Sequence, residues 1–114
     1  MGEVQELRGV RLFLDGMFKP ALSPRNLYLA LYCIPELLGM QRITDSVITP
    51  GGHVLQGIVI IAESHVAIAQ TPEHGFIDIS TCAPEKLNDS VVIQYVEDIL
   101  HFQTAKVWKQ RWET

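Results

Sequence analysis

Several features that assign a chain to a familiar class of protein are missing from this sequence. It has only two cysteines, Cys33 and Cys82, which are too few for a disulfide framework and do not have the spacing of a metal site. No stretch approaches the roughly 18 consecutive apolar residues of a membrane-spanning helix. The segment Met1 to Gly9 lacks the apolar core of a signal peptide. We therefore expect a cytoplasmic protein with no membrane segment and no bound metal.

A strong excess of charge is also missing. The chain has 9 Lys and Arg against 13 Asp and Glu, giving a formal net charge of −4. No basic cluster stands out, which argues against nucleic acid as a partner. The segment KVWKQRW, from Lys106 to Trp112, does interleave basic and aromatic residues as single-strand-binding segments do. An edge strand with solvated charges accounts for the same pattern, and we favour that interpretation.

Apolar residues, in contrast, are plentiful. They make up 47% of the 114 residues, which is enough for one packed core and too many for a disordered chain. A chain of this length usually forms one domain. The sequence shows no linker or internal repeat, so we expect residues 1–114 to form a single domain.

Hydrophobic periodicity predicts two helices and six strands. Ser23 and Pro24 form a typical helix start, with serine as the N-cap and proline in the first turn. Pro35 predicts a kink or break of this helix near Ile34, and Gly39 predicts its end. The other predicted elements are strands at 10–17, 42–49, 54–63, 65–70, 76–81 and 102–112, a turn at 50–52, a loop at 71–75 and a second helix from Pro84-Glu85.

The order of these elements indicates the fold class. A strand, a helix, four strands, a helix and a final strand contain few of the crossovers that a parallel sheet requires. The expected fold is therefore α+β: a two-layer sandwich with a mainly antiparallel sheet and both helices on one face.

The segment from Gly57 to His65, GIVIIAESH, carries the main chemical signal. A Val- and Ile-rich run predicts a buried strand, and an acid, a hydroxyl and an imidazole follow it as Glu63, Ser64 and His65. Cys82 ends a later strand-like segment, GFIDISTC. Taken alone, Ser64 and His65 are simply polar residues at a tight turn, because the sequence supplies no third group to orient them. Cys33 and Cys82, taken alone, are small buried side chains.

Together these residues resemble the prokaryotic S-adenosylmethionine decarboxylases. The resemblance spans most of the chain, from the strand around Leu12–Asp15 to the final segment, and it implies a two-layer α/β sandwich that forms a homodimer with active sites near the subunit boundary. The best-matched motifs are AESH (Ala62 to His65), Pro72-Glu73, Gly75-Phe76, Asp78 and Thr81-Cys82.

The resemblance also implies a chemistry. The bond between Glu63 and Ser64 would break by itself, and Ser64 would become a pyruvoyl group, the cofactor that holds the substrate as a Schiff base and accepts electrons as carbon dioxide leaves. Cys82 would act in this processing and protonate the product, a role that suits a readily ionised thiol. Glu73 would hold the substrate ribose hydroxyls, although a carboxylate in a polar loop is more often simply solvated.

Three positions depart from the family pattern. Alanine stands at Ala69 in place of a histidine implicated in the elimination step, and alanine takes no proton. Gln56 replaces a serine that assists processing, and Thr71 replaces an adenine-stacking tryptophan. His65 or His74 would have to act as the base instead, but strand geometry predicts that His65 points to the opposite side of the pleat from Ser64.

Three hypotheses follow. We favour an S-adenosylmethionine decarboxylase-related protein of the polyamine-biosynthesis family whose Glu63–Ser64 bond is cleaved poorly or not at all. A working pyruvoyl-dependent decarboxylase, acting on S-adenosylmethionine or another amino acid, is the enzymatic alternative. The third hypothesis is a homologue without catalysis. It would bind a small molecule, regulate an active partner or retain only the fold as an interaction protein. The first two hypotheses imply a small-molecule substrate, and all allow a homodimer.

Overall fold

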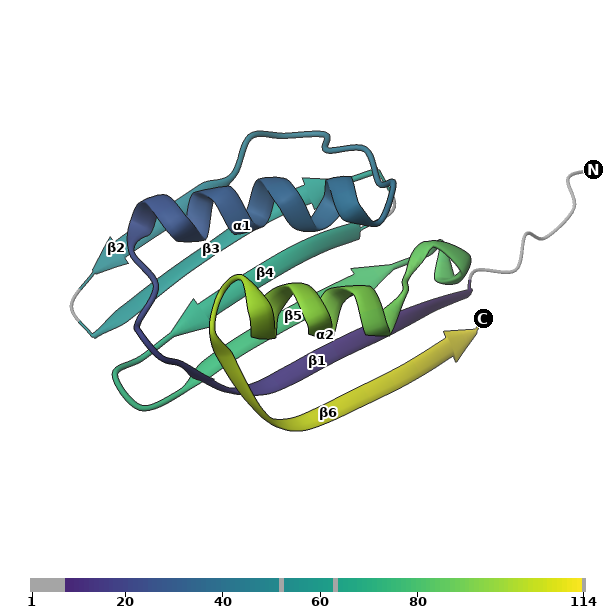
Figure 1. Cartoon of the computed structure of the whole chain (residues 1–114). Helices are drawn as coiled ribbons and strands as arrows, with labels where there is room; N and C mark the ends of the chain where they lie inside the picture. Colours follow the sequence, from purple (N-terminus) through teal and green to yellow (C-terminus); the bar gives the residue numbers. More distant parts are fainter. Residues whose placement is uncertain (1–7, 52, 63, 114) are drawn as a thin grey trace, which may run out of the picture.

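A sheet and a helical layer make up the molecule. The computed structural model describes residues 8–51, 53–62 and 64–113. Six antiparallel strands run in the order β2-β3-β4-β5-β1-β6, and both helices lie on the same face of the sheet (Figure 1). The predicted fold class is therefore confirmed. The elements are β1 (Arg8–Phe18), α1 (Pro24–Leu37), β2 (Val47–Gly51), β3 (Val54–Ile61), β4 (Ser64–Gln70), β5 (Gly75–Thr81), the short 3₁₀ helix η1 (Pro84–Lys86), α2 (Asp89–Asp98) and β6 (Phe102–Glu113).

The two faces of the sheet differ in their side chains. Along β5, Ile77 and Ile79 are fully buried under the helices, whereas Phe76 and Asp78 alternate with them and lie on the other side. We call the side away from the helices the open face. On the four central strands it carries Arg11 and Phe13 of β1, Gln56, Ile58 and Ile60 of β3, His65, Ala67 and Ala69 of β4, and Phe76, Asp78 and Ser80 of β5.

The first helix begins and ends where the sequence predicts, but it is not broken in between. Ser23 is the N-cap, and its Oγ accepts a hydrogen bond of 3.1 Å from the Asn26 N–H. The helix continues through Pro35 to Leu37, so the predicted break near Ile34 is wrong. Pro35 lies in the last turn, where its ring costs a single intrahelical hydrogen bond. Gly39, with φ of +66°, then ends the helix in the left-handed conformation that glycine tolerates.

Helix α1 packs closely on β3 because a glycine faces it. A Cβ atom on Gly57 would lie 2.7 Å from Cδ1 of Leu31, so a larger residue would force the Leu31 side chain to shift. Leu27 and Leu31 are fully buried here. Burying one such leucine stabilises the fold by about 1.5–3 kcal/mol.

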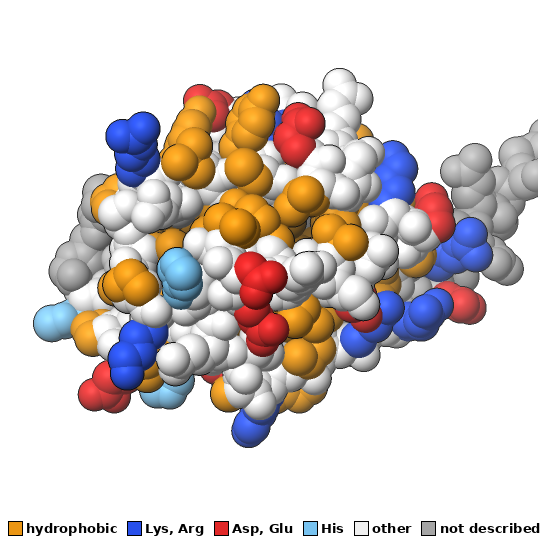
Figure 2. Space-filling view, in the orientation of Figure 1, with side chains coloured by type: hydrophobic (Ala, Val, Ile, Leu, Met, Phe, Trp, Pro, Cys, Tyr) orange, Lys and Arg blue, Asp and Glu red, His pale blue; other side chains and the backbone are white. Residues whose placement is uncertain are grey.

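The second helix starts later than predicted. Pro84 and Glu85 belong to the separate turn η1, and α2 begins at Asp89, behind an Asn88 N-cap whose Oδ1 accepts a hydrogen bond of 3.2 Å from the Val91 N–H. An asparagine cap is a stronger start signal than the proline before it. Figure 2 shows apolar side chains gathered between the two helices.

Cys33 of α1 lines the groove between α1 and α2, together with Tyr95. The thiol is partly exposed, so the expectation of a buried Cys33 is wrong. Burial raises the pKa of the Tyr95 hydroxyl, and the neighbouring Cys33 raises it further.

The strand predicted at 42–49 is shorter and lies further along the chain. Arg42 makes only an isolated bridge to Ile61, and β2 starts at Val47. Asp45 explains the difference, because its carboxylate accepts hydrogen bonds of 2.9 Å from both the Ser46 N–H and the Tyr28 hydroxyl, bending the chain away from the ladder. The predicted turn at 50–52 is also displaced. Residues 50 and 51 belong to β2 and pair with Leu55 and Val54 of β3, and Gly52 lies outside the described residues.

Candidate functional site

Ser64 opens β4 at the hairpin that joins it to β3. Its register partners are Ile61 on β3 and Thr81 on β5, so the connection from β3 to β4 is short. Glu63 itself, the expected cleavage partner, lies outside the described residues. The sheet therefore places Ser64 at one end of the molecule, beside the end of β5.

Cys82 lies at the same end. It directly follows Thr81, whose Cα pairs with that of Ser64 at the about 4.5–5.5 Å typical of antiparallel neighbours. Thr81 is fully buried, and its Oγ1 accepts a hydrogen bond of 2.9 Å from the Ala83 N–H, which fixes the turn that carries Cys82. The thiol is exposed, so the expectation of a buried, inert Cys82 is wrong. The sheet register thus places Ser64 beside Thr81, the residue that precedes Cys82.

A charged cluster begins next to Ser64. The Ser64 Oγ lies 3.4 Å from Nδ1 of His65, and Nε2 of His65 lies 3.8 Å from Oδ2 of Asp78. Arg11 donates two hydrogen bonds to Asp78, of 2.8 and 2.9 Å, and this interaction raises the pKa of the guanidinium. Strand alternation places Ser64 and His65 on opposite sides as predicted, but at the first residue of the strand the hydroxyl still reaches the ring.

Sequence reasoning gave no role to Asp78 or Arg11. The sequence marks Asp78 only as part of the family pattern, and nothing in the sequence singles out Arg11. Alternation along the predicted strands indicates which face of the sheet each residue lies on. It does not indicate that the two residues are neighbours. Their pairing depends on the β1–β5 register, in which Arg11 faces Ser80 and Asp78 faces Phe13.

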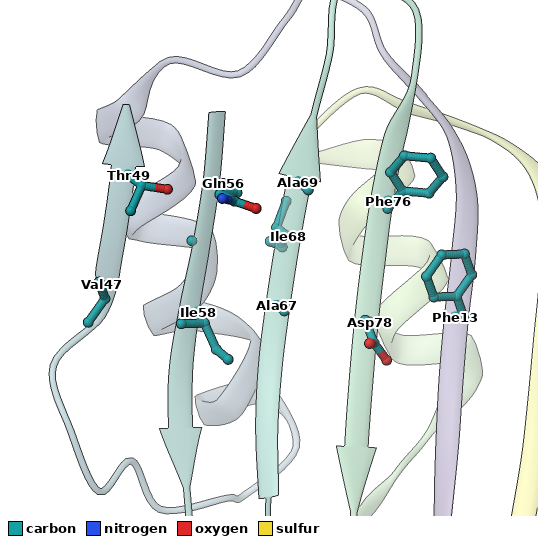
Figure 3. A pocket seen from close by; sticks show the side chains of 11 residues that line it. Phe13, Val47, Thr49, Gln56, Ile58, Ala67, Ile68, Ala69, Phe76 and Asp78 are labelled. Carbon is teal, nitrogen blue, oxygen red and sulfur yellow. The ribbon is translucent and has the colours of Figure 1, made fainter. Parts of the chain in front are cut away.

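The positions that depart from the family lie elsewhere on the open face. Gln56 of β3 is the direct partner of Ala69 on β4, and Ala69 in turn faces Phe76 on β5 (Figure 3). Ala69 lies five residues beyond Ser64 on the same strand, which corresponds to about 17 Å at the usual strand rise. Within one chain, neither position 69 nor position 56 can touch Ser64.

Glu73 is also remote from Ser64. It lies in the exposed turn between β4 and β5, where Thr71 and His74 hydrogen-bond to each other through the Thr71 N–H at 2.8 Å and the Thr71 Oγ1 at 3.1 Å. This turn is at the opposite end of β4 from Ser64. The structure therefore unites Ser64, His65 and Cys82 and separates them from Gln56, Ala69, Thr71 and Glu73.

A shallow hollow on the open face is lined by Gln56 and Ala69 of the second group and by none of Ser64, His65 and Cys82. Its volume is about 380 Å³, and its floor is formed by the small side chains Ala67 and Ala69. Phe13 and Phe76 form one wall, with ring centroids 5.8 Å apart (Figure 3). Aromatic walls with a few polar groups are typical of small-molecule sites.

Metal binding and membrane crossing gain no support from the described part of the chain. Among residues 8–51, 53–62 and 64–113, no three His, Cys, Asp or Glu side chains come together as metal ligands. Neither described helix has the length and apolar character needed to cross a membrane.

Comparison with solved structures identifies the fold. The crystal structure of the adenosylmethionine decarboxylase from Aquifex aeolicus VF5 superposes with a TM-score of 0.70, covering 93% of this chain and 89% of that one. At 19% identity this likeness shows the fold, a two-layer sandwich of the S-adenosylmethionine decarboxylase type.

Sequence comparison leads to the same family. S-adenosylmethionine decarboxylase proenzymes are 44% identical over 54 residues in Bacillus velezensis and 40% identical over 48 residues in Oceanobacillus iheyensis. These matches cover 46% and 40% of this chain but only 41% and 37% of the relatives, and no family model matches the sequence. The chain is thus similar to S-adenosylmethionine decarboxylases in fold and, over less than half of its length, in sequence.

Proposed function

We propose that this protein belongs to polyamine biosynthesis as an S-adenosylmethionine decarboxylase relative whose Glu63–Ser64 bond stays intact or breaks slowly. The observation that supports this is the Gln56–Ala69 pair on the open face. Alanine cannot remove the Ser64 α-proton, a step needed before Ser64 can become pyruvoyl. Loss of a general base costs about 10²–10⁴ in rate.

The residues fit formation of a pyruvoyl group only in part. Ser64 is the residue that would carry it, and Cys82 is its exposed neighbour. Such a group supplies the electron sink for decarboxylation. Position 69, however, offers no proton acceptor, and Thr71 offers no aromatic ring to a nucleoside base. We therefore propose an intact chain as the main form of the protein.

Intact mass tests this proposal directly. We expect the purified protein to give one species of 12.8 kDa with a free N-terminus, unchanged after prolonged incubation. Ser64→Ala, which cannot cleave, is the matched control. Two fragments, 1–63 and a blocked 64–114, would instead show a working decarboxylase precursor. In that case carbon dioxide release from S-adenosylmethionine, ornithine and arginine would identify the substrate.

We also propose that the protein forms a homodimer through the open face. Large apolar side chains are exposed there, with Val47 60% exposed, Trp108 48%, Ile60 41% and Ile58 37%. A patch of this kind usually marks an interface. Two copies related by a two-fold axis, with their β4 strands antiparallel, would bring Gln56, Ala69 and Glu73 of one chain toward Ser64 of the other. The distance between Ser64 and these residues within one chain thus supports a dimer.

A charge on this face is expected to break the dimer. Ile58→Lys would bury an unpaired ammonium in the interface, so light scattering across a dilution series should show monomer where the unsubstituted protein is dimeric. Leu29→Lys is the matched control, because Leu29 is 45% exposed on the helical side. Equal masses for both variants and the unsubstituted chain would contradict the proposed interface.

A second candidate function is small-molecule binding without catalysis, including regulation of an active partner. The hollow over Ala67 and Ala69 favours it, because its volume lies in the range of ligand sites. Calorimetric binding of S-adenosylmethionine by a chain whose mass stays intact would support this function. Absence of binding at millimolar ligand would count against it.

A further inference from the structure

The last strand, β6, forms one margin of the sheet and pairs with β1 along one side (Figure 1). Among the described residues, no strand pairs with its other side, so every second backbone N–H and C=O of β6 lies free there. The 12 residues of β6 span about 40 Å at the usual strand rise. Residues 105–111 are all exposed. The margin of β6 is thus a long row of main-chain groups open to another strand.

Two side-chain contacts hold β6 in place. Near the middle of the strand, Nζ of Lys109 lies 2.9 Å from Oδ2 of Asp89, at the start of α2. Near its end, the ring of Trp112 lies against Gly9 of β1, where a Cβ atom would overlap it. A strand that is already fixed loses little conformational freedom when a second strand joins it. The margin is therefore preorganised for such an addition.

Strands β1 and β6 concentrate the positive charge of an acidic protein. Together they carry five of the nine Lys and Arg residues but only two of the 13 Asp and Glu residues. The five are Arg8, Arg11, Lys106, Lys109 and Arg111. The two strands come from opposite ends of the chain, so the sequence does not show this grouping. The margin of β6 is a local positive region on a protein of net charge −4.

Two cations of β6 stay available for a partner. Lys106 faces Asp15 across the β1–β6 register, but its ammonium lies 5.8 Å from the centroid of the Trp108 ring, and within the described part of the chain it makes no ion pair. Arg111 lies opposite Val10 and likewise makes no ion pair with a described residue. Both charges therefore lack a close counter-charge along this margin.

These charges select what can pair with β6. Lysine on an edge strand usually deters the addition of another strand. A second copy of β6 would bring its own Lys106, Lys109 and Arg111 against the same three cations, which is unfavourable. A strand with carboxylates brings the opposite charge. Single-stranded nucleic acid is also negative, but it has no alternating N–H and C=O groups to pair with a strand.

We propose that the free margin of β6 binds an extended acidic segment of another protein, which adds to the sheet as a seventh strand. Lys106 and Arg111 are five residues apart, so alternation places them on opposite faces of the sheet. The segment therefore carries two acids five positions apart, one opposite each cation. Its main chain lies in the plane of the sheet, so a dimer formed through the open face leaves this margin free.

A labelled peptide tests this assignment. The probe has about 12 residues, to match β6, with blocked ends and two glutamates five positions apart among serines and threonines. Fluorescence anisotropy at low salt should show saturable binding to the full chain, and amide hydrogen exchange should slow in residues 103–112. Lys106→Glu combined with Arg111→Glu should weaken binding about tenfold. Lys19→Glu combined with Arg25→Glu, at exposed cations elsewhere, is the matched control and should not weaken it.

Two further sets of peptides separate strand addition from simple charge attraction. A peptide of the same composition with its glutamates four positions apart should bind more weakly, because both acids then lie on one face. N-methylation of alternate residues blocks the N–H groups on one side of a strand. One set of alternate positions should abolish binding, and the complementary set should leave it nearly unchanged.

Three results would overturn the proposal. These are no binding of the five-spaced peptide at millimolar concentration, equal losses from the two methylation patterns, and unchanged affinity in the Lys106→Glu, Arg111→Glu variant. Tighter binding of an oligothymidylate than of the peptide would also overturn it and would assign the margin to single-stranded nucleic acid. None of these results bears on whether the chain stays intact at residue 64.

Discussion

Replacing Ala69 by histidine and Gln56 by serine in one chain (Ala69→His, Gln56→Ser) is expected to produce spontaneous cleavage between residues 63 and 64. The histidine restores a base on the open face, which should raise the cleavage rate by about 10²–10⁴. Both changes are needed because residues 56 and 69 are direct partners, with Cβ atoms about 4.5–5.5 Å apart, so the Gln56 side chain crowds the new ring. Mass spectrometry over time would follow the two fragments.

A mixing experiment then shows which chain the new base serves. A chain carrying Ala69→His, Gln56→Ser and Ser64→Ala cannot cleave itself. Unfolded and refolded together with the unsubstituted chain, it should cause cleavage of that chain at Ser64, because the base reaches only a partner's serine. The unsubstituted chain refolded alone is the control. Cleavage confined to chains that carry both the base and Ser64 would contradict the face-to-face dimer.

The second large effect concerns stability. Ile79→Ala removes a fully buried side chain between the sheet and the helices, and we expect it to lower the free energy of unfolding by about 2–5 kcal/mol. The matched control is Ile60→Ala, on the open face, where the side chain is 41% exposed. Urea unfolding at low protein concentration should show a much smaller loss for Ile60→Ala.

Protein concentration adds a test of the interface. If two copies cover the open face, the loss caused by Ile60→Ala should grow as the concentration rises, because dimerisation stabilises only the folded state. The loss caused by Ile79→Ala should depend less on concentration. Similar losses at every concentration for Ile60→Ala would indicate that Ile60 stays uncovered.

The sequence predicts the order of elements well because periodicity and caps are local. The alternation in β5 and the Ser23-Pro24 start need no knowledge of the rest of the chain. The strand predicted at 42–49 fails because of a contact distant in sequence. The hydrogen bond from the Tyr28 hydroxyl to Asp45 bends the chain away from the predicted strand, and Tyr28 lies 17 residues earlier, in α1.

The candidate site shows the same division. The family motif predicts that Ser64 and Cys82 act together, and the β4–β5 register pairs Ser64 with Thr81, the residue before Cys82. Motif comparison also treats Ala69 and Glu73 as part of that site. A motif gives only the order of residues, and it does not show that an extended strand carries these two positions far from Ser64. The cluster of His65, Asp78 and Arg11 depends on the register of three strands, which no local pattern encodes.

Pro50 has a consequence for how copies of this protein associate. It lies in β2, the outermost strand beyond β3, and pairs with Leu55. Proline has no N–H to offer a further strand, which disfavours sideways addition of a strand at this margin. Stacking of one sheet upon another does not use this margin, which favours a closed pair of molecules over an open-ended polymer.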